Sequence, residues 1–581
     1  MGQKSDKTRR DWLAAETGTI RKRSQGRLFV ALVYPNTYAL GMSNLGFQTV
    51  YRLFNRLDHV VCERAFHPDS PKTGASPITT VESGRAIGDA DIIAFSVSFE
   101  KDFPHLLNVL AGAGLPLASC DRGTPHPLVL AGGVACFLNP EPIAEFVDCF
   151  LLGEAETNLP AFLERFDPAI DRLSLLETLS REVPGIYVPA FYQPSYHPDG
   201  TLARFDPVRD VPSTVQSPVL ADLSTESTCS TVLTPHTEFA DTYLVEVSRG
   251  CPHGCRFCSA GYVYRPPRFR LQDQLSACVA EGARLSGAVG LVGAAVSDLP
   301  DLPGLCAMPE ASQVRFSFSS LRADALTPAL IDTLFKSRVK TATIAPDAGS
   351  ERMRRVINKG VTEAQILQAT EALVTGGIPN LKLYFMVGLP TETDADVAAI
   401  GKLCKKVKDR FLAASRPRGR IGTITVSVNP FVPKPVTPFQ WAAMFPPAVL
   451  RNKIRTIRTA LNQVANLRIQ AENPKGAYLQ ALLSRGDRRV ATLLRHAHNI
   501  GGNWASTFKS AKPPADFFAT RPRALHERLP WDFIDHGIDP TFLAEEYRRA
   551  LAERPSPPCP ADTCDVCRRC RRSGNEPKPP A

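Results

Sequence analysis

The sequence predicts an α/β protein in three parts: an N-terminal doubly wound, Rossmann-like domain, a central partial (βα)6 barrel and a C-terminal helical region. Two observations carry this prediction. Short aliphatic runs alternate with helical stretches in two separate regions, which indicates parallel sheets covered by helices on both faces. Helical stretches then dominate beyond about residue 440. At 581 residues, the chain is also longer than one hydrophobic core usually serves.

The first alternating region is expected to form a domain over residues 25–198, after an N-terminal arm over residues 1–24. Its expected strands are Leu28–Val33, Asp91–Val97, Pro127–Ala131 and Cys149–Leu152, and its expected helices are Gly46–Leu57 and Phe103–Ala113. Ligands of open parallel sheets lie beyond the carboxyl ends of the strands. Those ends are small or polar here, so we expect a bulky cofactor to approach Ser96, Ser98, Gly132 and Gly133.

The second alternating region covers residues 240–440 and follows a linker, residues 199–239, with room for one small hairpin. Its expected strands are Tyr243–Val247, Val289–Val292, Val314–Ser317, Thr341–Ile344, Leu381–Val387 and Thr423–Val428. Its expected helices are Leu271–Leu285, Pro328–Lys336, Thr362–Thr375 and Asp394–Val407. These units form an open version of the eight-unit barrel, whose site lies at the carboxyl ends of the strands.

The remainder divides into a helical region, residues 441–552, and a cysteine-rich tail, residues 553–581. Helices are expected at Pro447–Asn466 and Lys475–His498. No apolar run approaches the roughly 18–20 residues that a membrane span needs, and the charged N-terminus does not resemble a secretory signal. Scattered, unevenly spaced cysteines favour reduced thiols over a disulfide scaffold. We therefore expect a cytoplasmic protein without a membrane partner.

Three cysteines follow the first strand of the predicted barrel. Cys251, Cys255 and Cys258 place three thiols within eight residues. Three soft thiolates on one loop can hold three irons of a cubane cluster, and the fourth iron then stays open to a small molecule. A structural zinc site is the alternative, but zinc normally takes four protein ligands, so this triplet would need a distant fourth one.

The spacing Cys-x3-Cys-x2-Cys, with Phe257 before the last cysteine, resembles the signature of radical S-adenosylmethionine (SAM) enzymes. The resemblance implies that a 4Fe-4S cluster on these catalytic cysteines chelates SAM beside Phe257. Electron transfer from the cluster then cleaves SAM to a 5′-deoxyadenosyl radical. A reducing electron donor is implied as well.

The N-terminal region resembles the cobalamin-binding-like domain of one radical SAM subfamily. The matching blocks include ALVYPNTYALGMSNLG (31–46), DIIAFSVSFE (91–100), LVLAGGVACFLNPEPIAEFVD (128–148) and LLGEAE (151–156). Cobalamin binding, and with it methylation of an unactivated carbon, is one expectation. However, the Asp-x-His-x-x-Gly motif that supplies a histidine to cobalt is absent. The domain can therefore also have kept only the fold. In the core, Asp347 stands where the subfamily pattern has glutamate.

The ends of the second and third core strands offer partners for SAM. A sulfonium ligand with a ribose and an amino acid needs hydroxyl or carboxylate groups and a cation. Residues of suitable type are Ser297, Asp298, Ser319 and Arg322. Each of them can instead be an ordinary turn or strand-cap residue.

A second group of cysteines lies in the tail, at Cys559, Cys564, Cys567 and Cys570. Proline-rich and charged flanks make a hydrophobic core unsuitable for this segment, so metal ligation is the preferred interpretation. The metal can be a second iron–sulfur cluster or zinc.

The substrate class stays open between a small molecule, a peptide and RNA. The net charge is +10, and residues 402–458 carry thirteen Lys or Arg against one acid, Asp409. Such a bias suits phosphates, but without interleaved aromatic residues a solvated basic helix face with a positive channel for anionic cofactors is the preferred explanation. The alternatives to a cobalamin-dependent methyltransferase are an RNA-modifying or thiolating radical SAM enzyme without cobalamin, and a non-catalytic iron–sulfur or zinc protein.

Overall fold

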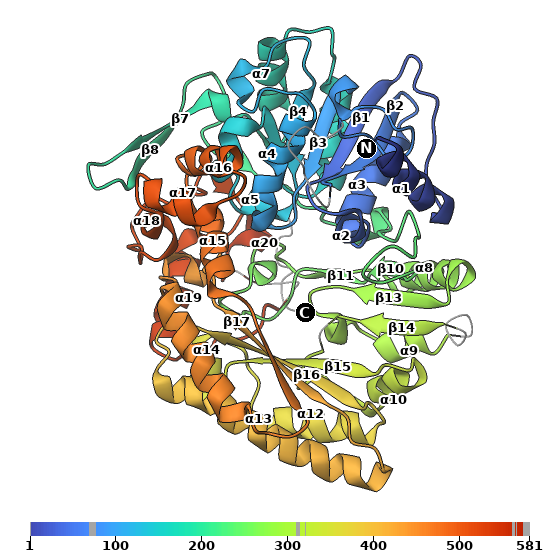
Figure 1. Cartoon of the computed structure of the whole chain (residues 1–581), viewed down its shortest axis with the longest axis vertical. Coiled ribbons are helices and arrows are strands. Elements are labelled where there is room, and N and C mark those ends of the chain that lie inside the picture. Colours follow the sequence, from blue (N-terminus) through green and yellow to red (C-terminus); the bar gives the residue numbers. More distant parts are fainter. Residues whose placement is uncertain are drawn as a thin grey trace.

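The structure is a computed structural model that describes residues 2–68, 77–308, 314–319, 321–560, 564 and 566–572. The N-terminal sheet lies above the barrel-like core in Figure 1, and the C-terminal helices run alongside both. The predicted mixed α/β class is confirmed, because parallel sheets with covering helices form both layers.

The N-terminal sheet has the strand order β2-β1-β3-β4-β5-β6, and every pair except β5–β6 is parallel. The strands are β1 (Leu28–Tyr34), β2 (Val60–Phe66), β3 (Ile92–Ser96), β4 (Leu128–Gly132), β5 (Cys149–Leu151) and β6 (Ile186–Tyr187). The helices are α2 (Tyr38–Met42), α3 (Leu45–Arg56), α4 (Phe103–Gly112), α5 (Val134–Leu138), α6 (Ala155–Arg165) and α7 (Arg172–Glu182). All four predicted strands and both predicted helices are present.

Strand β2 is an element that the sequence pattern did not predict. It contains Glu63 and Arg64, yet every residue of the strand is buried. The guanidinium of Arg64 lies 2.6 Å from the carboxylates of both Glu16 and Glu82. Glu16 directly follows α1 (Gly2–Ala15), which forms where we expected only an arm. Buried charges require such partners, and only the fold brings these three residues together.

The core combines two parallel sheets, ordered β10-β13-β14 and β15-β16-β17-β18. A parallel bridge between Leu321 and Ile344 links them, so the strands follow one another in chain order around an open barrel. The strands are β10 (Tyr243–Glu246), β13 (Ala288–Val292), β14 (Arg315–Phe318), β15 (Thr341–Asp347), β16 (Asn380–Val387), β17 (Ile424–Pro430) and β18 (Leu467–Ala471). The six predicted strands are confirmed, and β18 is an additional one.

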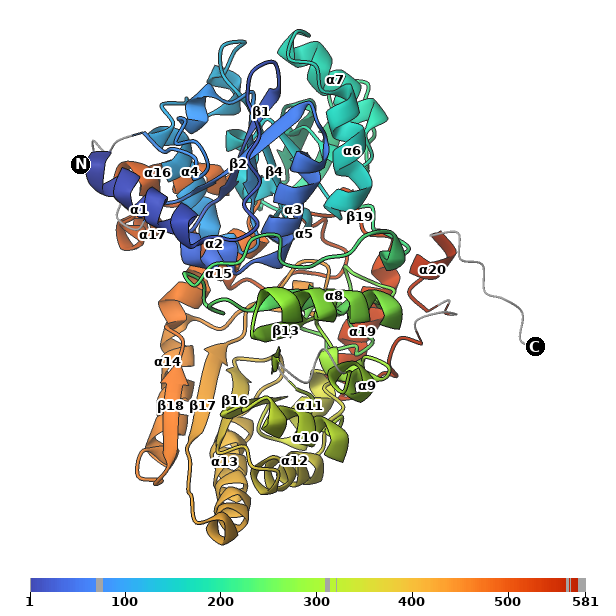
Figure 2. The same ribbon diagram turned by 90° about the vertical axis from the view of Figure 1, so that its right-hand side faces the viewer.

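Helices cover the outside of the barrel strands, as Figure 2 shows for α12 and α13. They are α8 (Gln272–Leu285), α9 (Leu302–Cys306), α10 (Pro328–Lys336), α11 (Glu351–Val356), α12 (Glu363–Thr375), α13 (Asp394–Ser415) and α14 (Pro447–Leu461). The predicted helix Pro447–Asn466 ends early because the chain turns at Asn466 into β18, which pairs with β17. Two of the five residues of β18 are exposed and none is fully buried, so its pattern resembles a surface segment.

The C-terminal helices are α15 (Pro474–Arg485), α16 (Val490–Asn499), α17 (Trp504–Ser510), α18 (Ala515–Ala519), α19 (Pro540–Leu551) and α20 (Arg569–Arg572). The prediction of one continuous helix over Lys475–His498 was wrong. The chain breaks at Gly486, where the amide of Asn139 donates to the carbonyls of Ser484 and Gly486 at 3.0 and 2.8 Å. Asn139 of the N-terminal domain thus supplies hydrogen bonds to backbone carbonyls at the C-terminal end of α15, where the helix provides no further donors.

Short strand pairs complete the fold. They are the hairpin β7 (Tyr192–Tyr196) and β8 (Leu202–Pro207), the parallel pair β9 (Val215–Gln216) and β19 (Ile534–Asp535), and the antiparallel pair β11 (Ser248–Arg249) and β12 (Arg268–Phe269). The expected hairpin therefore begins before the linker. Within the described residues, no helix combines the length and apolarity that a membrane crossing requires.

Candidate functional site

A cavity of about 550 Å³ lies where the carboxyl ends of the N-terminal strands face those of the core. Its N-terminal wall includes all four residues that the sequence placed at the strand ends, Ser96, Ser98, Gly132 and Gly133. Its core wall includes Ser248, Gly250 and Gly293. The structure thus brings the two predicted rims together across one space.

The cavity also extends inward beneath the N-terminal sheet. Leu32, Ala94 and Leu130 line it from strands β1, β3 and β4, while Phe54 of α3 and Leu159 of α6 line it from the covering helices. These five residues are at most 4% exposed. The space therefore lies between the domains and continues into an apolar slot between the sheet and two helices.

The cysteine loop begins right after β11. Gly250 there has a φ of +80°, and a Cβ atom would lie 2.5 Å from the carbonyl oxygen of Tyr264, so this position requires glycine. Arg256, inside the cysteine motif, is fully buried. Its guanidinium donates to the carbonyls of Arg355 and Val356 at 3.1 and 2.9 Å, at the end of α11. A buried arginine thus anchors the loop to the core.

The three thiols lie in a partly desolvated site with cations nearby. Burial raises the pKa of Cys251 to about 11 and that of Cys255 to about 12. Arg322 acts in the opposite direction on Cys251, as Lys359 does on Cys255. These cations favour the thiolates that metal binding requires.

The donor set fits a cubane cluster. Each thiol lies close enough to another to influence its pKa. In the part of the chain that the structure describes, no three His, Cys, Asp or Glu side chains converge tightly enough for a single metal ion. The thiolates of a cubane bind separate irons, so they do not need to converge on one point.

Of the expected SAM partners, Asp298 and Arg322 lie close enough to Cys251 to influence its pKa. The carboxylate of Asp298 lies 2.8 Å from Nε2 of His253, within hydrogen-bonding distance. The hydroxyl of Ser319 donates to the carbonyl of Gly293 at 3.2 Å, on the cavity wall. The hydroxyl of Ser297 is buried and has no hydrogen-bond partner among the described residues.

The other two expected partners have protein contacts of their own. Arg322 forms a forked pair with Asp324 at 3.0 and 2.7 Å. Phe257 packs against a small apolar cluster that includes Ala348 and Leu389. The aromatic ring thus contributes to the packing beneath the loop.

Sequence reasoning missed Lys359, which the fold places beside the triad. Its ammonium group lies 2.7 Å from the carboxylate of Asp347. Burial opposes its charge, but Asp347 and Cys255 raise the pKa of Lys359 and keep it cationic. Asp347 has a φ of +60° at a bulge that ends β15. Strained residues cluster at functional sites, and the departure from glutamate at Asp347 was the signal in the sequence.

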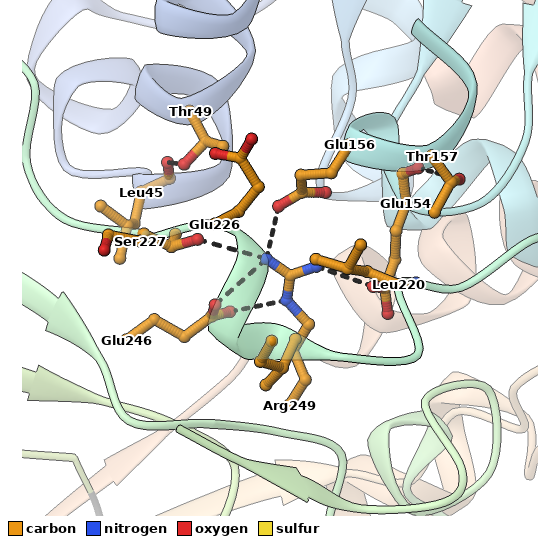
Figure 3. Close-up of polar contacts among 12 residues, drawn as sticks. Leu45, Thr49, Glu154, Glu156, Thr157, Leu220, Glu226, Ser227, Glu246 and Arg249 are labelled. Carbon is orange, nitrogen blue, oxygen red and sulfur yellow. Dashed lines mark hydrogen bonds and ion pairs between the residues drawn. The ribbon is translucent and has the colours of Figure 1, made fainter. Parts of the chain in front are cut away.

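A network of ionic contacts around Arg249 was also missed (Figure 3). Arg249 donates to Glu154 at 2.7 Å, to Glu156 at 2.6 Å and to Glu246 at 3.0 Å. Glu154 also accepts from Arg268 at 2.7 Å. Burial disfavours these charges, but the neighbours raise the pKa of Arg249 and lower that of Glu154. The network joins α6 of the N-terminal sheet to the cysteine loop.

The tail returns to the same loop. The backbone N–H of Cys559 donates to the carbonyl of Pro252 at 2.7 Å, and the N–H of Asp539 donates to the carbonyl of Cys567. Burial raises the pKa of Cys570, and the thiols of Cys567, Cys559 and Cys564 raise it further. The four tail cysteines therefore lie near one another, and Cys559 lies against the loop of the first triad.

Comparison with known proteins agrees with this geometry. The family model described as radical SAM proteins, N-terminal, matches residues 46–189, and the model of the radical SAM superfamily matches residues 245–404. The chain belongs to the radical SAM superfamily of enzymes. Members of this superfamily use a 4Fe-4S cluster and SAM, and they require an electron donor.

Two proteins are similar to this chain in sequence. Uncharacterized protein MJ0966 of Methanocaldococcus jannaschii is 30% identical over 475 residues, which is 81% of this chain and 91% of that protein. The threonylcarbamoyladenosine tRNA methylthiotransferase MtaB of Treponema pallidum is 26% identical over 209 residues, 34% of this chain and 43% of that enzyme.

Two solved structures are similar at low identity. The radical SAM methyltransferase TsrM of Kitasatospora setae, with cobalamin and a [4Fe-4S] cluster, is 13% identical, covers 84% of this chain and all of its own, and has a TM-score of 0.45. The cobalamin-dependent enzyme OxsB is 12% identical, covers 90% of this chain and 79% of its own, and has a TM-score of 0.43.

Proposed function

We propose that Cys251, Cys255 and Cys258 ligate the 4Fe-4S cluster, and that the adjoining cavity holds a corrinoid for methyl transfer to an unactivated carbon. The observation that carries this proposal is the continuity of the cavity. It runs from the slot beneath the N-terminal sheet to Gly250 and Ala260, which flank the cysteine motif on either side. A ligand in the slot would therefore extend to the cluster loop.

The shape of the cavity supports a corrinoid. Such a cofactor has a broad head and a long nucleotide arm, and the cavity offers a space lined by small residues at the rim and a buried apolar slot below it. Small residues at Gly132 and Gly133 leave the rim open to a broad group. Among the described lining residues there is no histidine, in keeping with the missing Asp-x-His-x-x-Gly motif. The cobalt would therefore lack an imidazole ligand from this wall.

When bound, the cluster supplies the electron that cleaves SAM, and the corrinoid supplies a cobalt centre that carries a methyl group. The chain's own residues bind SAM and orient it. We assign the free hydroxyl of Ser297 and the carboxylate of Asp298 to the polar groups of SAM, and Arg322 to its carboxylate. The two facing domains keep water away from the reacting centre, which protects a radical.

The test is anaerobic purification with added cobalamin, followed by gel filtration and measurement of 5′-deoxyadenosine after addition of SAM and dithionite. We expect the wild-type protein to retain the corrinoid and to cleave SAM. Ser98→Trp fills the rim and should lose the corrinoid but keep its iron. The matched control is Ser174→Trp, at an exposed serine of α7, which should behave as wild type. SAM cleavage by a wild-type protein that retains no corrinoid would overturn the cobalamin branch, and a wild-type protein with a full cluster but no cleavage would refute the enzyme.

A second candidate is modification of RNA, favoured by a basic groove of about 400 Å³ beside β18. Arg451, Arg455 and Arg458 line it from one face of α14, and all three are exposed. No ion pair joins them to an acid within the described ranges of the chain. The similarity to a tRNA methylthiotransferase supports the same substrate class. Binding to bulk RNA that weakens steeply with salt would favour this candidate, and absent or salt-insensitive binding would exclude it.

A further inference from the structure

The tail segment 554–559 lies along the outside of the cysteine loop. The guanidinium of Arg256 donates to the carbonyl of Arg554 at 2.7 Å and to the hydroxyl of Ser556 at 3.0 Å. Asn358 joins both segments, because its amide nitrogen donates to the carbonyls of Gly254 and Ser556 at 3.1 and 3.2 Å. Its amide oxygen accepts from the N–H of Ser556 at 2.8 Å. These hydrogen bonds hold the tail segment against the cysteine loop.

The tail cysteines are concentrated around one buried cation. The thiols of Cys567 and Cys570 are 2% and 7% exposed. The Arg265 guanidinium faces the thiols of Cys559 and Cys567, and its backbone carbonyl accepts from the side chain of Arg569 at 2.5 Å. Four thiols gathered near a buried cation form a donor set for a negatively charged metal–thiolate centre.

The connection between the two cysteine groups is short. Cys251 is bonded to Pro252, and the Pro252 carbonyl accepts the N–H of Cys559 at 2.7 Å. One residue and one hydrogen bond therefore separate the first cysteine of one group from the first cysteine of the other. A purely structural zinc site would not need this proximity, whereas transfer of electrons between two centres benefits from a short bonded path.

We propose that Cys559, Cys564, Cys567 and Cys570 bind a second iron–sulfur cluster that delivers electrons to the cluster of the loop. In each event, an external low-potential one-electron donor, of the reduced ferredoxin or flavodoxin class, loses one electron to the tail cluster. The tail cluster then returns to its oxidised state as the loop cluster gains that electron. No bond between protein atoms forms or breaks. The inference rests on the loop cluster of the proposed function.

The first test is metal content and electron paramagnetic resonance of the full-length, anaerobically reconstituted wild-type chain. We expect about eight irons per chain and two reduced spin systems, since each 4Fe-4S centre holds four. The double variant Cys564→Ser/Cys570→Ser should keep about four irons and the loop signal alone. The control Cys120→Ser/Cys306→Ser removes two thiols outside both groups and should keep about eight. One zinc and about four irons in the wild type would overturn the proposal, whether or not the variants fold.

The second test follows reduction of the loop cluster by a reduced ferredoxin in stopped flow. We expect the tail variant to be reduced more slowly than the wild type, and the control variant to match the wild type. Equal rates in all three proteins would overturn the relay. Failure of the two hypotheses is distinguishable: eight irons without 5′-deoxyadenosine would contradict the proposed function, while cleavage of SAM by a wild-type chain with four irons would contradict only the tail cluster.

Discussion

The carboxylate of Glu154 lies 2.7 Å from the guanidinium of Arg249, two residues before Cys251. Glu154 immediately precedes α6 of the N-terminal sheet, whereas Arg249 belongs to β11 of the core. Both residues line the cavity between the two layers. The contact therefore helps to fix the cysteine loop relative to the proposed corrinoid site, together with the ion pairs Arg249–Glu156 and Arg268–Glu154 between the same two layers.

Glu154→Gln should destabilise the protein. Removing one charge leaves Arg249 and Arg268 short of a partner, and breaking a buried pair in this way costs about 3–5 kcal/mol. Urea unfolding at neutral pH should show this loss in the free energy of unfolding. The matched control is Glu164→Gln on the same helix, where the carboxylate is 74% exposed. An equal stability of both variants would contradict the role of Glu154.

The same pair predicts a dependence on pH. The pKa of Glu154 is lowered in the folded protein, so its contribution is complete above the ordinary carboxyl pKa and is lost as pH falls through the lowered value. The stability difference between wild type and Glu154→Gln should therefore shrink in acid. A difference that stays constant down to the acid limit would show that the charge is not responsible.

Cys255→Ala should prevent assembly of the loop cluster and abolish cleavage of SAM. Two remaining thiolates cannot hold a cubane that needs three. Absorbance of the anaerobically reconstituted protein and formation of 5′-deoxyadenosine measure the two effects. Cys120→Ala, at an exposed cysteine far from the loop in sequence, should retain both. Cleavage by Cys255→Ala would place the active cluster elsewhere.

His536→Phe should make the protein more resistant to mild acid. His536 is 5% exposed, and burial, with help from Arg569, lowers its pKa to about 3. The neutral ring is favoured in the fold, so the stability that it provides is present above the ordinary pKa and is lost as pH falls from about 6.5 to 3. At pH 5 the loss is about 2 kcal/mol. Urea unfolding at pH 7 and pH 5 should show a smaller decrease for His536→Phe than for the wild type. His197→Phe, at an exposed histidine, should keep the wild-type decrease.

Lys359→Met should weaken both the fold and the cluster. Its loss leaves the buried carboxylate of Asp347 unpaired, which costs about 3–5 kcal/mol, and removes a cation that favours the thiolate of Cys255. Thermal unfolding and the iron retained after desalting measure these effects. Lys336→Met is the control, because this lysine pairs with Asp332 at the surface and is 74% exposed. Iron retention equal to wild type would show that Lys359 does not support the cluster.

The periodicity of apolar residues and the spacing of the cysteines predicted most of the fold and the first cysteine site. The aliphatic strands formed where predicted because their apolar residues are buried: Leu28–Val33 is buried on both faces, and Leu381–Val387 is buried at every second residue. The strand-end residues Ser96 and Gly132 do line a cavity, because parallel strands end at one edge of a sheet. The sequence pattern failed to predict the strands that contain charged or exposed residues. Strand β2 contains buried charges and no residue of β18 is fully buried, so neither has the pattern of a core strand.

The sequence by itself determined the radical SAM class, through three cysteines spaced on one loop after a strand. Local spacing suffices there, because a cluster takes its ligands from neighbouring residues. The tertiary structure alone decided what surrounds that loop. Glu154 pairs with Arg249, which lies 95 residues further along the chain. The N–H of Cys559, in the C-terminal tail, donates to the carbonyl of Pro252 in the cysteine loop. Ion pairs and hydrogen bonds join such partners only in the folded protein. Residues so far apart in the sequence leave no local pattern that predicts their contact.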